Sequence, residues 1–155
     1  MLKQIEALSL VGADLTGACL AGASLRRLVL SRAHLQNADL EEADLAFAML
    51  DRATLAQANL GRASLIAAAL MGADLTQARL NDANLHNANL FQAALDGTQL
   101  QRADLTGTDL RETILRGVDL TEAIFDRHTL WPDGFDPLAY GARLKDPDRQ
   151  PVASR

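Results

Sequence analysis

The sequence is poor in the residues that usually fill or cross-link a globular core. Only 4% of its 155 residues are aromatic, and valine and isoleucine occur just four times each. A single cysteine, Cys19, excludes a disulfide framework and any metal site built from several cysteines. Large rings cannot make the interior of this protein, so a different kind of packing has to fill it.

The sequence also lacks a membrane-spanning run, a secretory signal and a positive net charge. No apolar run approaches the roughly 20 residues of a membrane span. The start, MLKQIEALSL, lacks the charged region and the apolar stretch of a secretory signal. The net charge of −5 disfavours direct nucleic-acid binding. We therefore expect a cytoplasmic protein that binds neither membrane nor nucleic acid directly.

What the sequence does contain is a repeat of five residues. A leucine falls at every fifth position from Leu10 to Leu120. From Ala13 to Val118 the residue two positions before it is small, mostly alanine, except for Leu28. The position directly before the leucine favours small polar residues such as Asp39 and Asn59. No proline interrupts the chain before Pro132.

This repeat excludes the helix that the leucine and alanine content would suggest. Five residues on an α-helix turn the chain by about 500°, so successive leucines would lie about 140° apart and form no stripe. A coiled coil fails too, because its apolar seam repeats about every 3.5 residues. Within one unit the small residue and the leucine point one way and the residue between them points the other, as in a strand. Two further residues then turn the chain, which predicts a solenoid with leucine inside.

The units also carry a family resemblance. Residues 38–40 (ADL), 43–45 (ADL) and 58–60 (ANL) resemble the A(D/N)LXX unit of the pentapeptide-repeat family, and the resemblance extends over 8–130. It implies an all-β fold, a right-handed quadrilateral β-helix in which four units make one coil, and hence about six coils. The segment 131–137 (WPDGFDP) resembles the ending of small cyanobacterial members.

The ends of such a solenoid need caps, because they expose core and unpaired backbone groups. We expect an N-terminal cap over 1–7, the β-helix over 8–130, a C-terminal cap over 131–144 and a disordered tail over 145–155. Trp131 and Phe135 are predicted to cover the last coil. Asp136 followed by Pro137 is a favourable helix start, so a short capping helix is predicted over 137–144.

Stacked coils place every twentieth residue in one column. One column reads Asp14, His34, Thr54 and Asp74. These groups resemble nucleophilic partners, but catalysis also needs an oxyanion hole and a pocket that excludes water, which a flat wall lacks. His34, His86 and His128 fall in different columns, so a shared metal site is not expected. We predict no catalytic residue, no metal, no cofactor and no small-molecule substrate.

Two other columns are expected to stabilise the surface. The corner column Gly22, Glu42, Arg62, Asp82, Arg102 and Glu122 alternates in charge and predicts a ladder of ion pairs. The column Asn37, Gln57 and Gln77 predicts a ladder of amides.

One wall differs from the others because its outward columns are apolar. Val29, Met49, Ala69, Met71 and Phe91 lie there, and Phe47 lies on the adjoining corner. Contiguous exposed apolar surface often marks an interface, so we predict that Val29, Met49, Met71, Phe91 and Phe47 bind an unidentified protein partner or a second copy of the chain. The alternative is that each is tolerated singly, since a solenoid has nowhere else to put it.

A different binding function is mimicry of DNA, by which some pentapeptide-repeat proteins protect type II topoisomerases from quinolones. Such mimicry needs a long, predominantly acidic surface. Residues 10–125 carry 14 acidic and 9 basic residues, interleaved on the same columns. The sequence therefore favours a protein-binding scaffold and keeps the DNA mimic as the alternative.

Overall fold

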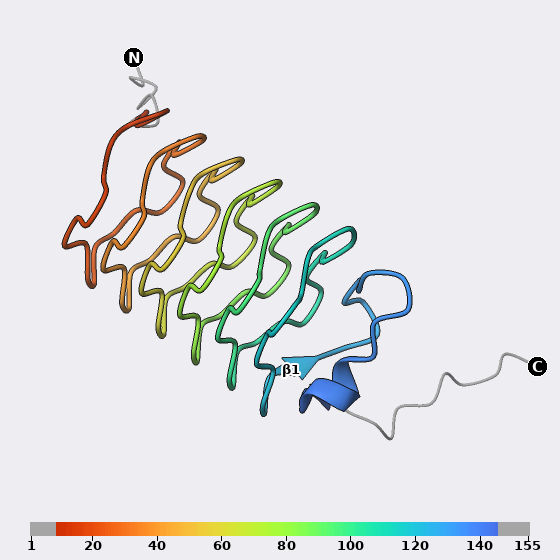
Figure 1. Cartoon of the computed structure of the whole chain (residues 1–155). Helices are drawn as coiled ribbons and strands as arrows, with labels where there is room; N and C mark the ends of the chain where they lie inside the picture. Colours follow the sequence, from red (N-terminus) through yellow and green to blue (C-terminus); the bar gives the residue numbers. More distant parts are fainter. Residues whose placement is uncertain (1–8, 146–155) are drawn as a thin grey trace, which may run out of the picture.

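The chain folds into a solenoid of stacked four-sided coils. The computed structural model describes residues 9–145, and its coils follow one another along a single axis (Figure 1). Residues twenty apart form parallel bridges, as Ser9 does with Val29 and Asp39 does with Asn59. The bridges recur every five residues, so each coil has four short walls and four corners. The predicted β-solenoid is confirmed.

Hydrogen bonds hold each corner within its own coil and to the neighbouring one. Within the coil, the N–H of Ala38 donates to the carbonyl of Leu35 at 3.1 Å. Toward the next coil, the N–H of Leu35 donates to the carbonyl of Thr54 at 2.7 Å, and that of Asn37 to the carbonyl of Ala56 at 3.1 Å. The same pattern recurs along the stack, so neighbouring coils fix each other's backbone.

The second residue after each leucine has positive φ, which was not predicted. From residue 12 to residue 122, every fifth residue has φ between 52° and 69°. Glycine occupies seven of these positions: 12, 17, 22, 72, 97, 107 and 117. Sixteen other residues, Asn37 and Gln77 among them, hold the same conformation. A left-handed non-glycine residue costs roughly 1–2 kcal/mol, and the bonds shared between coils maintain it.

Where the residue before the leucine is aspartate or asparagine, its side chain satisfies a donor that the coil-to-coil bonds omit. Among the described residues, the N–H directly after the leucine donates to no backbone carbonyl. The Oδ1 of Asp39 accepts the N–H of Glu41 at 3.2 Å, and the Oδ1 of Asn59 accepts that of Gly61 at 3.2 Å. Ten units make this Asx turn. The preference for aspartate and asparagine therefore has a local cause.

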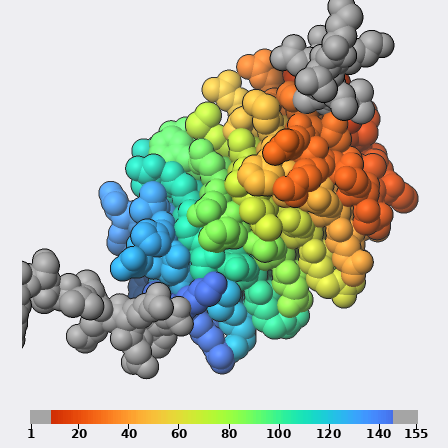
Figure 2. All heavy atoms as spheres, turned by 180° about the vertical axis from the view of Figure 1, so that it is seen from behind, coloured from red at the N-terminus to blue at the C-terminus, as the bar shows by residue number. Residues whose placement is uncertain are grey.

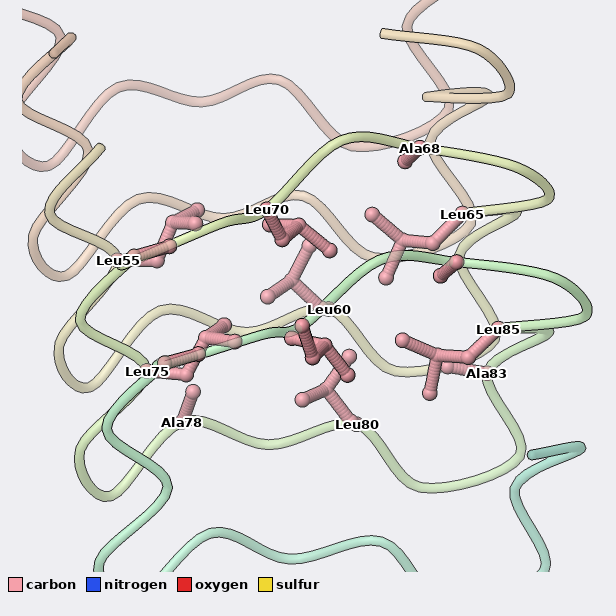
Figure 3. Close-up of a cluster of buried hydrophobic side chains, with 14 of the residues drawn as sticks. Leu55, Leu60, Leu65, Ala68, Leu70, Leu75, Ala78, Leu80, Ala83 and Leu85 are labelled. Carbon is pink, nitrogen blue, oxygen red and sulfur yellow. The ribbon is translucent and has the colours of Figure 1, made fainter. Parts of the chain in front are cut away.

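Leucine and its small partner form one continuous core. The leucines of the five-residue frame from Leu30 to Leu110 are 0–1% exposed. Figure 3 shows Leu55 above Leu75 and Leu65 above Leu85, so the side chains of successive coils stack in columns. The predicted arrangement, with leucine inside and the polar residue outside, is confirmed. Leucines of the first coil, Leu10, Leu15, Leu20 and Leu25, are half-buried and pack on this core.

Coils that are adjacent in the sequence are also adjacent in the stack. The space-filling view from behind shows the colours following in order along the axis, so a coil contacts the coils next to it in the chain (Figure 2). Each wall can therefore be described column by column.

The C-terminal end contains the named elements β1 (Ile124–Phe125), η1 (Pro137–Tyr140) and β2 (Arg143–Leu144). A short helix begins at Pro137 with Asp136 as its N-cap, as predicted, but η1 is a 3-10 helix that ends at Tyr140, so the predicted end at 144 is wrong. Gly141 ends it in the left-handed conformation at φ 86°, and β2 then pairs in parallel with β1. Among residues 9–145, no helix has the length and apolarity that a membrane crossing requires.

Aromatic side chains gather beside these elements. Trp131 stacks on Phe135 with ring centroids 5.3 Å apart, and Phe135 stacks on Tyr140 at 4.7 Å. Phe125 meets Trp131 edge-on at 5.6 Å. Trp131 and Phe135 pack against the leucine core. This cluster places apolar surface over the last coil. The predicted N-terminal cap and most of the predicted tail lie outside the described residues.

Candidate protein-binding surface

One wall of the solenoid, here called the apolar wall, consists of two outward columns. The first is Ser9, Val29, Met49, Ala69, Asn89, Asp109 and Leu130, and its members are joined by consecutive bridges. The second is Val11, Ser31, Asp51, Met71, Phe91 and Arg111. The stacking therefore brings the predicted site residues of these columns onto one surface.

Exposure differs among the predicted residues. Met49, Met71 and Phe47 are exposed by 45%, 41% and 42%, whereas Val29 and Phe91 are half-buried. Val29 and Phe91 are not among the described side chains that pack against the leucine core. Val11, which the prediction omitted, is the most exposed member at 56%. Its place in the same column as Met71 is the sequence signal that would have identified it.

Local contacts fix the backbone of this wall and the ring of Phe47 at its edge. The N–H of Met71 donates to the Oδ1 of Asp51 at 3.1 Å, which replaces the Asx turn that Ala69 cannot make. Phe47 lies on the corner with φ 60°, beneath the guanidinium of Arg26 at 4.9 Å from its ring centroid. Such cation–π contacts orient Phe47 at the edge of the wall.

A shallow hollow lies at the N-terminal half of the wall. Val11 and Met71 line it together with Ser31 and Asp51, and Arg32 and Arg52 border it. Both arginines are exposed corner residues with φ of 59° and 57°. Neither forms an ion pair with any residue between 9 and 145. The hollow thus combines apolar side chains with two arginines that have no ion pair and one carboxylate, Asp51.

The C-terminal half of the wall is neutralised instead. The guanidinium of Arg111 donates to both carboxylate oxygens of Asp109, at 3.0 and 2.7 Å. This hydrogen bond lowers the pKa of Asp109 and raises that of Arg111. Asp109 and Arg111 therefore form a closed pair, with little free charge for a ligand.

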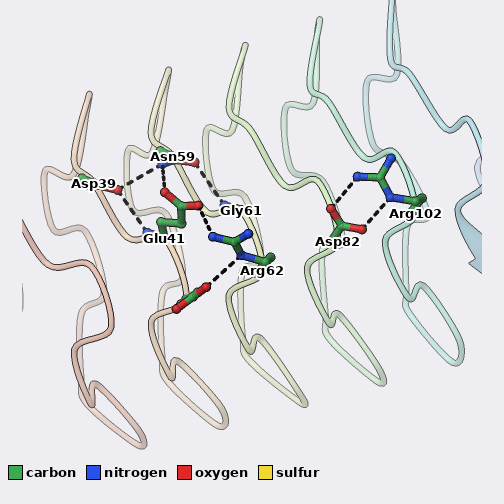
Figure 4. A network of polar contacts seen from close by, with 8 residues as sticks. Asp39, Glu41, Asn59, Gly61, Arg62, Asp82 and Arg102 are labelled. Carbon is green, nitrogen blue, oxygen red and sulfur yellow. Dashed lines mark hydrogen bonds and ion pairs between the residues drawn. The ribbon is translucent and has the colours of Figure 1, made fainter.

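The predicted charge ladder is present in part, as separate ion pairs, on the opposite side of the solenoid (Figure 4). In the part of the chain that the structure describes, no ion pair joins Arg62 to Asp82 or Arg102 to Glu122. Arg62 pairs with Glu41 at 2.6 Å and with Glu42 at 2.9 Å. Arg102 makes two bonds of 2.7 Å to the carboxylate of Asp82. That contact lowers the pKa of Asp82. Exposed pairs of this kind contribute little each, so the ladder accounts for the surface without a ligand.

The amide ladder is present in part. The Nε2 of Gln57 donates to the Oε1 of Gln77 at 3.2 Å. No side-chain bond joins Asn37 to either glutamine in the described part of the chain. The column serves as surface stabilisation, as the sequence predicted for its last two members.

The column that resembles catalytic partners lies on an exposed wall. His34 is exposed, with its Nδ1 3.4 Å from the Oγ1 of Thr54. The Oδ1 of Asp14 instead accepts the N–H of Thr16 at 3.1 Å. Hydrogen bonds from Thr16 lower the pKa of Asp14. The carboxylate is thus committed to its own turn and does not orient the imidazole, as a catalytic arrangement requires.

The structure offers no grouped metal ligands in residues 9–145, where no three His, Cys, Asp or Glu side chains come together. Cys19 is exposed and free.

The repeat that builds these walls also matches a known family. The sequence profile described as pentapeptide repeats matches residues 9–46, 48–87, 68–107 and 88–127, with eight copies. The chain belongs to the pentapeptide-repeat family. No curated protein matches it.

Solved structures of pentapeptide-repeat proteins resemble this one. HetL, involved in heterocyst differentiation regulation in the cyanobacterium Nostoc sp. strain PCC 7120, is 31% identical with a TM-score of 0.60, over 89% of this chain and 68% of HetL. A pentapeptide-repeat protein of the Arabidopsis thaliana thylakoid lumen is 32% identical with a TM-score of 0.64, over 65% of this chain and 70% of its own. QnrB1, a plasmid-mediated fluoroquinolone resistance protein, reaches 20% identity and a TM-score of 0.42, over 89% of this chain and 78% of its own.

Proposed function

We propose that this pentapeptide-repeat protein is a non-enzymatic scaffold that binds a protein partner through its apolar wall. The observation that carries the proposal is the exposure of Met49, Met71, Phe47 and Val11 on one side of the solenoid. Elsewhere, charged side chains such as Arg62 and Arg102 are paired in ladders.

The kind of residue on this wall supports binding to protein. Methionine, aromatic residues and arginine are enriched at the centres of protein interfaces, and methionine adapts its shape to different partners. Two adjacent coils fix the backbone beneath each side chain, so no backbone freedom has to be lost there on binding. HetL, a relative at 31% identity, is described as involved in regulation, which agrees with a role exerted through binding.

The alternative function, mimicry of DNA toward a type II topoisomerase, gains no support from the surface charges. Acidic residues such as Glu41, Glu42 and Asp82 neutralise arginines of the adjacent coil. A DNA mimic needs those carboxylates free along the surface.

The experiment compares three forms of the protein as baits in a lysate of the organism that encodes it. The variant Met49→Ser, Met71→Ser, Phe91→Gln removes the apolar side chains of the wall. We expect it to lose partners that the wild type retains, because such anchors commonly carry more than about 1 kcal/mol of binding each. Its melting temperature should stay close to that of the wild type, since none of these side chains enters the leucine core.

The control variant carries Gln36→Ala, Thr54→Ala and Thr76→Ala on the adjoining polar wall, whose members are half-buried like Phe91. It should retain every partner of the wild type. Sedimentation of all three proteins tests whether the partner is a second copy of the chain. Equal retention by the apolar-wall variant would show that the wall is only tolerated surface.

A further inference from the structure

The charge along one edge of the apolar wall differs from that of the ladder column. In the ladder column, Glu42, Arg62 and Asp82 alternate in sign from coil to coil. In the corner column beside the wall, Arg32 lies directly below Arg52 on the next coil. Like charges on adjacent strands destabilise a sheet. Because no described carboxylate pairs with either arginine, an anionic group from outside would relieve the repulsion.

The other edge of the wall has the same character. Arg27 also forms no ion pair within residues 9–145, and its guanidinium lies 5.7 Å from the ring centroid of Phe47. Between the edges lie the side chains of Met49 and Met71, and a single carboxylate, Asp51, bonded to the N–H of Met71. An apolar strip with basic borders is therefore present on a protein of net charge −5.

The spacing of the coils indicates the shape of the partner. Neighbouring strands lie about 4.8 Å apart, so anchors on successive coils recur at that interval along the axis. Successive turns of an α-helix rise about 5.4 Å, which keeps one helix face nearly in step over a few coils. Side chains on one face of an extended strand recur about every 6.8 Å, which does not match the coils.

Building on the proposed function, we propose that the apolar wall binds an amphipathic, acidic α-helix of a partner protein, laid along the solenoid axis. Apolar residues of that helix contact Val11, Met49 and Met71, and its carboxylates pair with Arg32 and Arg52. Helices recognise apolar grooves through anchors one turn apart in this way. An anionic lipid surface would pair with the same two arginines, so the test below includes vesicles as a separate outcome.

The test uses a fluorescein-labelled 16-residue helical peptide with leucines one turn apart and glutamates beside them. A second peptide has lysine at every glutamate position, and a third has the composition of the first with its leucines spread around the helix. Fluorescence anisotropy measures the affinity of each for the full chain. We expect the glutamate peptide to bind at least ten times more tightly than either of the others, and to weaken as salt is raised.

Matched variants assign the binding to the two arginines. Arg32→Gln with Arg52→Gln should lower the affinity for the glutamate peptide about tenfold. Glutamine is tolerated at these corners, because Gln57, Gln77 and Gln92 hold φ of 58–60° at equivalent positions. The control, Arg79→Gln with Arg127→Gln, changes two exposed arginines elsewhere that also lack ion pairs among the described residues, and should leave the affinity unchanged.

Several results would overturn the inference. Equal binding of the glutamate and lysine peptides would exclude charge recognition, and equal binding of the third peptide would exclude a helix face. Tighter, arginine-dependent binding to phosphatidylserine vesicles or to single-stranded DNA would assign the wall to lipid or nucleic acid. A native partner that needs Met49 and Met71 but tolerates both arginine substitutions would leave the proposed function standing and refute the acidic helix. A native partner indifferent to the apolar-wall variant would refute the proposed function itself.

Discussion

Leu70 shows what a single core position contributes in this fold. Its side chain is 0% exposed within a stack of leucines from neighbouring coils (Figure 3). Hydrogen bonds between coils hold the surrounding backbone, so the walls cannot collapse into a cavity. We expect Leu70→Ala to lower the free energy of unfolding by about 2–5 kcal/mol, measured by urea denaturation.

The exposed corner residue Gln77 supplies the comparison. Its side chain accepts one bond from Gln57 and makes no core contact. Gln77→Ala should cost less than about 0.5 kcal/mol. Glutamine and alanine are equally strained at positive φ, so the substitution does not change the strain of this corner. Similar losses from Leu70→Ala and Gln77→Ala would contradict the assignment of inside and outside.

Gly22 isolates the strain of the left-handed corner. Its φ is 66°, and a methyl group added there would meet no atom within 4 Å. Gly22→Ala should therefore lower the free energy of unfolding by about 1–2 kcal/mol through backbone strain alone. Gly61 is the control, since it lies at a turn position without positive φ. A methyl group there would lie 3.3 Å from the Oδ1 of Asn59, but Glu41 carries a full side chain in the equivalent turn with Asp39, so Gly61→Ala should not destabilise. If both substitutions behave alike in urea denaturation, the corner is not strained.

Among the elements, the C-terminal cap depends on its aromatic stack. Phe135 lies between Trp131 and Tyr140, with centroid distances of 5.3 and 4.7 Å. Phe135→Ala removes both contacts, and aromatic pairs contribute about 0.5–1.5 kcal/mol each. Because solenoid repeats are coupled mainly to their neighbours, the loss should remain near the cap.

Hydrogen exchange by mass spectrometry measures where that loss falls. The amides of residues 110–130 should exchange faster in Phe135→Ala, while those of residues 50–70 should be unchanged. Uniformly faster exchange would show that the solenoid unfolds as one cooperative unit and that the cap is no local element.

The sequence predicted the coils well, but it predicted the capping helix only in part and the left-handed corners not at all. A leucine at every fifth position predicts the solenoid coil, because an α-helix would not place leucines with that spacing on one face. The start of the capping helix was predicted correctly from Asp136 and Pro137, but its end was wrong because Gly141 ends it after one turn. The left-handed corners are enforced by bonds between coils, so residues with no such preference adopt them.

Leu130 shows a second limit of predicting the structure from the five-residue repeat. It falls on a multiple of five, yet it bridges Asp109, which lies 21 residues earlier, and is 43% exposed. One extra residue in the turn after Phe125 shifts the frame. In that turn the Oδ1 of Asp126 accepts the N–H groups of both His128 and Thr129. A shift of one residue reverses which side chains face inward.

At the scale of the whole molecule, stacking made the apolar wall predictable, because columns twenty residues apart remain in register. The exposure of Met49 and Met71 follows from that register. The basic borders were missed because charge was counted over the chain, whereas Arg32 and Arg52 adjoin one wall only. Which arginines lack partners depends on side-chain geometry, and the column pattern does not encode it.

The carboxylates give the whole solenoid a defined response to acid. The pKa of Asp119 lies below its ordinary value because the hydroxyl and N–H of Thr121 donate to it. Burial alone would raise the pKa of Asp126, but bonds from Gly107, His128 and Thr129 hold it below the ordinary value. A carboxyl group whose pKa is lower in the folded state stabilises the fold above its unfolded pKa, and that stabilisation is lost as the pH falls through the folded pKa.

We therefore expect the free energy of unfolding to be nearly constant from pH 7 to about pH 5 and to fall below about pH 4, the unfolded pKa of aspartate. Urea denaturation at successive pH values measures it. Asp119→Asn with Asp126→Asn removes the titrating charges but keeps a side-chain oxygen for the turn, as Asn59 and Asn84 do elsewhere. This variant should lose less stability than the wild type between pH 5 and pH 2. An equally steep loss in both proteins would place the acid sensitivity in other groups, because only the ionised form of these two carboxylates is favoured by the bonds they accept.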